Sequence, residues 1–73
     1  MAKTIYSKEY KRLVEKLKKA RIECGLSQIE VGNLFKKGQA FISKVEAGQQ
    51  RLDVIELCKF AKIYKKNIKY FLP

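Results

Sequence analysis

The sequence contains no histidine and no tryptophan, and Asp53 is its only aspartate. Histidine is the usual general base, and the other acidic residues are scattered glutamates, so the chain offers no catalytic constellation. Zinc sites are built mainly from cysteine and histidine, and a chain with two cysteines and no histidine is short of ligands. We therefore expect no enzyme, no metal site and no cofactor.

Cysteine and proline are also scarce. Cys24 and Cys58 form no CxxC motif, and both fall on apolar stripes of expected helices. We expect two buried, reduced thiols of a cytosolic protein, in a setting that does not suit a nucleophile. The one proline is the last residue, so no proline interrupts a helix.

Acidic residues are few: 17 Lys+Arg face 7 Asp+Glu, which gives a net charge of +10. Such a charge attracts polyanions, either nucleic acid or an anionic membrane surface. No apolar run approaches the roughly 20 residues of a membrane span. The start, MAKTIYSKEY, is polar, so we expect no signal peptide. The first helix could lie on a membrane as a basic amphipathic helix, but its leucines are needed in the core, so we expect no membrane partner.

Helical periodicity runs through most of the 73 residues, and no segment alternates like a strand. Gly25 and Gly48 are expected to end the first and third of five helices. The expected N-caps are Ser7, Ser27, Gly38, Asp53 and Asn67. Two of these caps are followed three residues later by a glutamate, which is the spacing of a capping box.

The apolar residues of these helices predict the core. Gly32 lies inside the second helix at a cost of about 1 kcal/mol against alanine, so we expect another helix to approach it closely. The residues expected to face inward are Tyr10, Leu13, Val14, Leu17, Ala20 and Cys24, then Val31, Leu34 and Phe35, then Ile42 and Val45, then Val54, Leu57, Cys58, Ala61 and Tyr64, and finally Ile68, Phe71 and Leu72.

The second and third helices are short and are separated by the tight turn Lys36-Lys37-Gly38, which is a helix-turn-helix arrangement. The segment LSQIEVGNLFKKGQAFISKVEAGQQR, residues 26–51, resembles the Cro/C1-type helix-turn-helix (XRE) family. It matches the family pattern at Ser27, Gln28, Val31, Gly32, Gln39, Ile42, Ser43, Glu46 and Gly48. The likeness extends over about residues 13–72, where Leu17, Arg21 and Gly25 also agree.

The resemblance implies a compact all-α bundle of five helices, the lambda-repressor-like DNA-binding fold. We expect a single domain over residues 1–73, with the motif at about residues 27–47 and a loose N-terminal arm at residues 1–6. The implied function is a sequence-specific regulator of transcription, a repressor that binds double-stranded DNA as a homodimer. We expect a cytoplasmic protein of prokaryotic, phage or plasmid origin. The alternative is an antitoxin-type protein, which would bind its own promoter and also a partner toxin.

The third helix would enter the major groove. Its expected base-reading residues are Gln39, Ala40, Phe41 and Lys44. A glutamine can bond adenine through N6 and N7, whereas Lys44 could meet guanine or only a phosphate, and Phe41 could meet a thymine methyl or pack at the rim. The expected phosphate contacts are Gln28, Lys37, Ser43, Gln49, Gln50 and Arg51.

The resemblance also assigns residues outside this face. Arg21 and Glu46 are expected to pair and to fasten the first helix to the third, and Gln28 is expected to brace Gln39. The chain departs from the family with lysines in the turn and at residues 65–66, and with Leu52 in place of a proline. The lysine run in and after the fourth helix is a second phosphate contact or a solvated face, and its members are Lys59, Lys62, Lys65, Lys66 and Lys69. The expected dimer surface is apolar and C-terminal: Tyr64, Ile68, Tyr70, Phe71 and Leu72.

Overall fold

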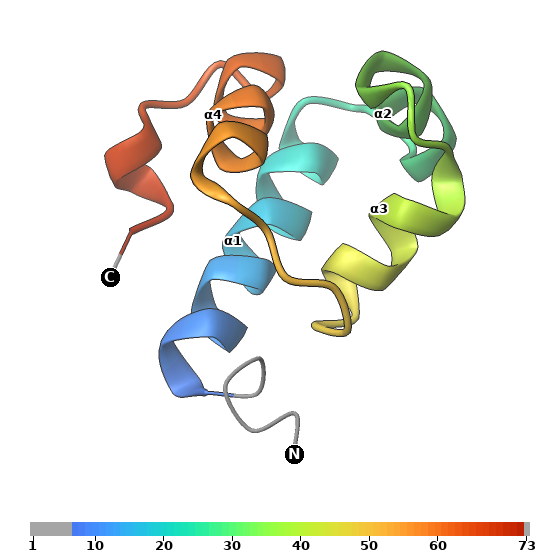
Figure 1. Cartoon of the computed structure of the whole chain (residues 1–73). Helices are drawn as coiled ribbons and strands as arrows, with labels where there is room; N and C mark the ends of the chain where they lie inside the picture. Colours follow the sequence, from blue (N-terminus) through green and yellow to red (C-terminus); the bar gives the residue numbers. More distant parts are fainter. Residues whose placement is uncertain (1–6, 73) are drawn as a thin grey trace.

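Figure 1 shows the computed structural model of the chain, which describes residues 7–72. The segments are α1 (Lys8–Glu23), α2 (Gln28–Phe35), α3 (Gln39–Glu46), α4 (Val54–Ile63) and the 3₁₀ segment η2 (Ile68–Tyr70). The all-α expectation is confirmed for this described part, in which no strand occurs. The expectation of five α-helices is wrong, because the last segment is a 3₁₀ turn. The expected N-terminal arm lies outside the described residues.

The last segment is 3₁₀ because its backbone bonds span three residues. The N–H groups of Tyr70, Phe71 and Leu72 donate to the carbonyls of the residues three positions earlier. Asn67 caps the segment, and its side chain accepts a bond of 2.9 Å from the Lys69 N–H. This tight turn brings Phe71 into the core, where the residue is 1% exposed.

The predicted helix starts are confirmed. Ser7 accepts a bond from the N–H of the third helical residue of α1. Ser27 and Glu30 form a reciprocal capping box at α2, with bonds of 3.0 and 2.8 Å. Asp53 and Glu56 form a second box at α4, with bonds of 2.7 and 3.0 Å. Each box pairs otherwise unpaired N–H groups of a helix start, which fixes where the helix begins.

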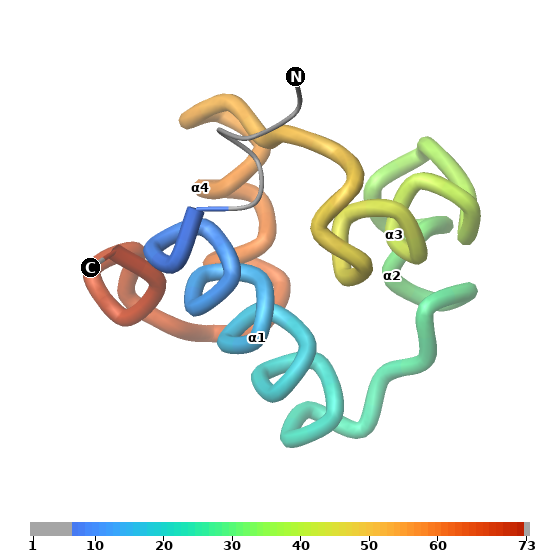
Figure 2. Tube along the Cα trace, turned by 90° about the horizontal axis from the view of Figure 1, so that it is seen from below, coloured from blue at the N-terminus to red at the C-terminus, as the bar shows by residue number. Residues whose placement is uncertain are grey.

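In both views, α2 and α3 lie together on one side of α1, and α4 and the C-terminal segment lie on the other (Figures 1 and 2). The core forms where these elements meet. Its largest fully buried side chains are Tyr64, Phe60, Phe71, Leu17, Ile42, Val31 and Val45. The aromatic rings continue across it, since the ring centroids of Phe35 and Phe60 are 4.4 Å apart and those of Phe60 and Tyr64 are 5.8 Å apart.

Gly32 explains how closely α2 and α3 approach each other. A Cβ at Gly32 would lie 2.5 Å from the carbonyl carbon of Gly38 and 2.7 Å from the backbone nitrogen of Gln39. The Gly32 carbonyl accepts the N–H groups of Lys37 and Gly38, and Lys36 takes the left-handed conformation with φ 62°. The predicted close approach is confirmed, although the neighbour is the turn and the first residue of α3.

Several residues predicted to face inward are exposed instead. Leu34 is 59% exposed, Val54 69% and Leu72 45%, and both Cys24 and Cys58 are exposed. The prediction for α4 is confirmed at Leu57, Ala61 and Tyr64 and is wrong at the other two residues. Its buried stripe is Leu57, Phe60, Ala61 and Tyr64, which leaves Cys58 at the solvent-exposed edge. Val54 is on the side of Leu57, but it is the first residue of α4 and is exposed there.

The other exposed residues lie at the ends of their elements. Cys24 is the C-cap of α1, where its thiol donates to the Tyr64 carbonyl at 3.4 Å. Leu34 lies beside Phe35, which takes the core position of the last turn of α2. Leu72 follows Phe71 beyond η2 and is therefore directed away from the core that Phe71 enters.

Candidate nucleic-acid interface

The outer face of α3 is polar and exposed. Ile42 and Val45 are fully buried and hold the helix against the core. Gln39, Ala40 and Lys44 are exposed, as is Ser43 on the same side. Gln39 and Ser43 are four positions apart, as are Ala40 and Lys44, so these side chains occupy one continuous face of the helix. A helix presented in this way has the dimensions that a DNA major groove admits.

Phe41 has a different environment from its neighbours. The side chain is half-buried, and its ring centroid lies 5.5 Å from that of Phe35. The Lys37 ammonium lies 5.1 Å from the Phe41 centroid, over the ring. These contacts correspond to the rim-packing alternative, while a base contact by Phe41 stays a prediction.

An ion pair joins α1 to the end of α3. Arg21 Nε donates to Glu46 Oε2 at 2.6 Å, and Arg21 Nη2 donates to Glu46 Oε1 at 3.1 Å. The side chains are only 12% and 5% exposed. Arg21 Nη1 also donates to the Leu26 carbonyl at 2.9 Å, which fixes the loop before α2. The hydrogen bond with Glu46 raises the pKa of Arg21, so the guanidinium remains charged at every relevant pH.

Gln28 extends this ion pair to the exposed face of α3. Its side-chain Nε2 donates to Glu46 Oε1 at 3.0 Å. Its Oε1 accepts from Gln39 Nε2 at 3.4 Å. The first residue of α2 therefore connects the first residue of α3 to the pair at the far end of that helix. Gln39 is exposed, yet the hydrogen bond to Gln28 on α2 fixes the orientation of its side-chain amide.

A hydrogen bond from α1 fixes the loop after α3. The Tyr10 hydroxyl donates to the Gln50 carbonyl at 2.5 Å, and Gln50 Nε2 donates to the Arg51 carbonyl at 3.2 Å. Burial raises the pKa of Tyr10, and the positive charge of Arg51 opposes this rise. Sequence reasoning missed this role of Tyr10, because no local signal links residues 40 positions apart. Gln49 and Arg51 are exposed beside the end of α3.

Lysines of the turn, of α4 and of the loop after α4 contact other side chains of the chain. Lys37, an expected phosphate contact, pairs with Glu56 at 3.7 Å and remains half-exposed. Lys66 pairs with Glu23 at 3.4 Å and lies 4.7 Å from the Tyr70 ring centroid. Lys59 lies 5.7 Å from the Phe35 ring centroid, toward α2. Lys59 and Lys66 therefore have intramolecular contacts of their own.

Residues 7–72 are informative about two other kinds of site, a metal centre and a membrane span. In this range, no three His, Cys, Asp or Glu residues come together in a way that could hold a metal ion. None of the helices described there has both the length and the apolar content to cross a bilayer.

Comparison with protein families gives one match. A family model described as helix-turn-helix matches residues 17–71 of the chain. The matched segment includes α2, α3 and α4 and every residue of the expected interface. Searches of curated proteins and of solved structures gave no match.

Proposed function

This chain belongs to the helix-turn-helix family of the Cro/C1 (XRE) type, a family of DNA-binding transcription regulators, and we propose that it is a repressor that binds its operator as a dimer. The observation that carries the proposal is the polar outer face of α3, with Gln39 held by Gln28. The net charge of +10 supplies the attraction to DNA. Repression follows if the bound protein occupies a promoter.

Base reading is assigned to Gln39, Ala40 and Lys44, with Phe41 at the edge of the contact. The carboxylate of Glu46 can only accept hydrogen bonds, so Gln28 must direct its NH₂ group to Glu46 and its carbonyl to Gln39. Gln39 then uses one N–H toward Gln28. Its second N–H and its carbonyl oxygen form the pair that adenine N7 and N6 require. The network thus favours adenine opposite Gln39.

Phosphate contacts are assigned to residues on both sides of the reading face. Gln28 is the first residue of α2, where free N–H groups and the helix dipole attract an anion. Gln49, Gln50 and Arg51 lie beyond the other end of α3, Ser43 lies on α3, and Lys37 lies in the turn before it. Contacts at both ends would fix the angle of α3 in the groove without reading sequence.

A dimer is proposed because one reading helix covers only a few base pairs, and two copies would place their helices about 34–36 Å apart. The C-terminal surface that the sequence predicts for the dimer has less support, because Tyr64 and Phe71 are each only 1% exposed and cannot contact a second copy. Val54 and Ile55 are 69% and 67% exposed and start α4, directly after the loop of expected phosphate contacts. We therefore assign the dimer surface to these two residues, together with the exposed Cys58 one turn later.

Selection of binding sites from random duplexes, at a stated salt concentration, tests this function. The proposal expects a two-fold symmetric consensus with half-sites about 34–36 Å apart and an adenine at the position facing Gln39. Enrichment of no sequence, with equal affinity for all duplexes, would contradict a sequence-specific regulator.

A further inference from the structure

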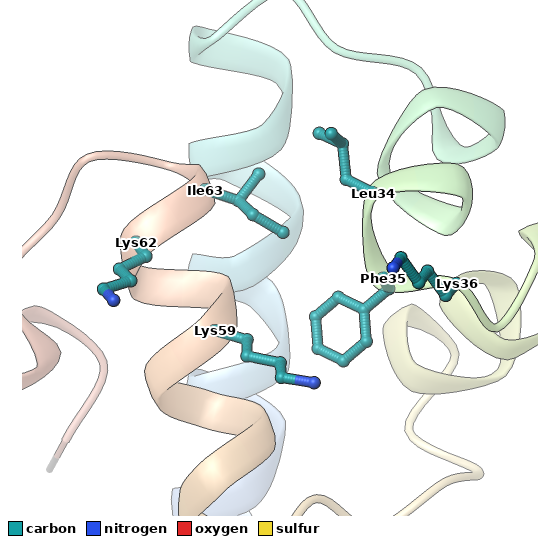
Figure 3. A pocket seen from close by; sticks show the side chains of 6 residues that line it. All are labelled: Leu34, Phe35, Lys36, Lys59, Lys62 and Ile63. Atoms are coloured by element: carbon teal, nitrogen blue, oxygen red, sulfur yellow. The ribbon is translucent and has the colours of Figure 1, made fainter.

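A groove lies between α2 and α4 and shares no residue with the base and phosphate contacts assigned above, although Lys59 and Lys62 of the lysine run border it (Figure 3). Leu34 of α2 and Ile63 of α4 extend into the same space, and the ring of Phe35 lies below them. The hollow has a volume of ≈ 320 Å³. Its lining residues are Leu34, Phe35, Lys36, Lys59, Lys62 and Ile63, and we call it the α2–α4 groove.

Ile63 also lines a second hollow. A neighbouring hollow of ≈ 470 Å³ is lined by Cys24, Leu26, Ile63 and Lys65, so the two hollows share Ile63. The combined surface has an apolar floor and four lysines at its border, and none of its lining residues is acidic.

Leu34 is the unusual residue of this surface. It is 59% exposed although it is large and apolar and lies beside the buried Phe35. Exposed apolar surface that is bordered by charged residues is typical of sites where another protein docks. The bordering lysines also select the charge of the partner, because their positive field attracts an acidic protein and repels a basic one.

We propose that the α2–α4 groove binds an amphipathic helix of another protein, one that carries aspartate or glutamate beside large apolar residues. Such a helix would insert its apolar side chains against Leu34 and Ile63 and direct its carboxylates to the bordering lysines. A second copy of this chain fits less well, because its dimer surface is assigned to Val54 and Ile55 at the start of α4, whereas Ile63 of the groove ends that helix. Nucleic acid would meet the lysines but would leave the apolar floor without a matching group.

The location of the groove has a consequence for regulation. Its lining residues are separate from every residue assigned to base or phosphate contact, so the partner helix and DNA can be bound at the same time. A protein that docks there would be recruited to the operator without displacing the regulator. The proposal does not depend on the repressor assignment, because it rests on the α2–α4 surface alone.

A displayed library of helical peptides, randomised on one face and selected against the folded full chain, tests the proposal. Selected peptides should carry acidic and large apolar residues together. Leu34→Ala should weaken their binding at least about fivefold. Ile22→Ala is the matched control, since Ile22 is 58% exposed on α1, and it should leave affinity unchanged. Lys59→Glu should weaken binding more than Lys11→Glu, a charge reversal on the exposed face of α1.

Each alternative gives a distinct result. Binding that is equally sensitive to Leu34→Ala and Ile22→Ala, or selected peptides without acidic residues, would overturn the proposal. A loss of self-association in Leu34→Ala, measured by sedimentation, would assign the groove to a second copy. A loss of duplex-DNA affinity in Leu34→Ala would assign it to nucleic acid. Because DNA affinity is measured separately, failure of the groove proposal and failure of the DNA-binding function are distinguishable.

Discussion

Replacing Arg21 with alanine should destabilise the fold strongly. The change removes both bonds to Glu46 and the bond to the Leu26 carbonyl. The Glu46 side chain is 5% exposed, so its carboxylate would be left buried with only Gln28 as a partner. Removing one partner of a buried pair costs about 3–5 kcal/mol. For a domain of this size, 1 kcal/mol shifts Tm by about 4–8 °C, so the Tm should fall by more than about 12 °C.

Thermal unfolding followed by circular dichroism measures this effect. Lys18→Ala is the matched control, because Lys18 lies on the exposed side of the same helix, and its Tm should change by no more than a few degrees. The double variant Arg21→Met with Glu46→Leu should recover most of the loss, since it leaves no buried charge. Equal melting temperatures for Arg21→Ala and Lys18→Ala would refute the reasoning.

Three further predictions address other parts of the molecule. Affinity for duplex DNA should fall with salt at a log–log slope near about −5, which corresponds to roughly six ion contacts per dimer; a titration that is flat between low and moderate salt would exclude an electrostatic interface. The hydrogen bond from the Ser27 N–H lowers the pKa of Glu30, so the stabilisation that the Glu30 carboxylate gives to the fold is complete above the unfolded-state pKa and disappears as pH falls through the lower folded-state pKa. The difference in Tm between the wild type and Glu30→Gln should therefore close on acidification. A difference in Tm that is constant with pH would contradict this. Replacing Val54 and Ile55 by serine should reduce dimerisation measured by sedimentation, whereas a bis-maleimide should link the Cys58 thiols of two wild-type copies. If the serine variant dimerises as the wild type does, the dimer surface is not at Val54 and Ile55.

The sequence predicts those parts of the fold that depend on neighbouring residues. Both capping boxes depend on a polar residue followed three positions later by a glutamate, and both are present. The close approach at Gly32 was also predictable, because a glycine inside a helix needs a packing reason. These features are local in the chain, so a single sequence contains their signals.

The predictions that failed depend on contacts between distant segments. Periodicity identifies α4 as amphipathic but does not fix which of two adjacent stripes is buried, and Phe60 rather than Cys58 occupies the core. No sequence pattern links Tyr10 to Gln50. Similarly, Leu34 has the spacing of a core residue, and only the arrangement of α2 against α4 leaves it exposed.

The central claim is that Gln39 reads a base from the outer face of α3, and competition binding of Gln39→Ala against single-base operator variants tests it most directly. The change should leave Tm unaltered, because the side chain is exposed. It should cost about 1–3 kcal/mol on the selected operator and relax preference at one position per half-site. Arg51→Ala, a proposed phosphate contact, should instead weaken all sequences evenly. A uniform loss for Gln39→Ala, with every base preference retained, would contradict the account.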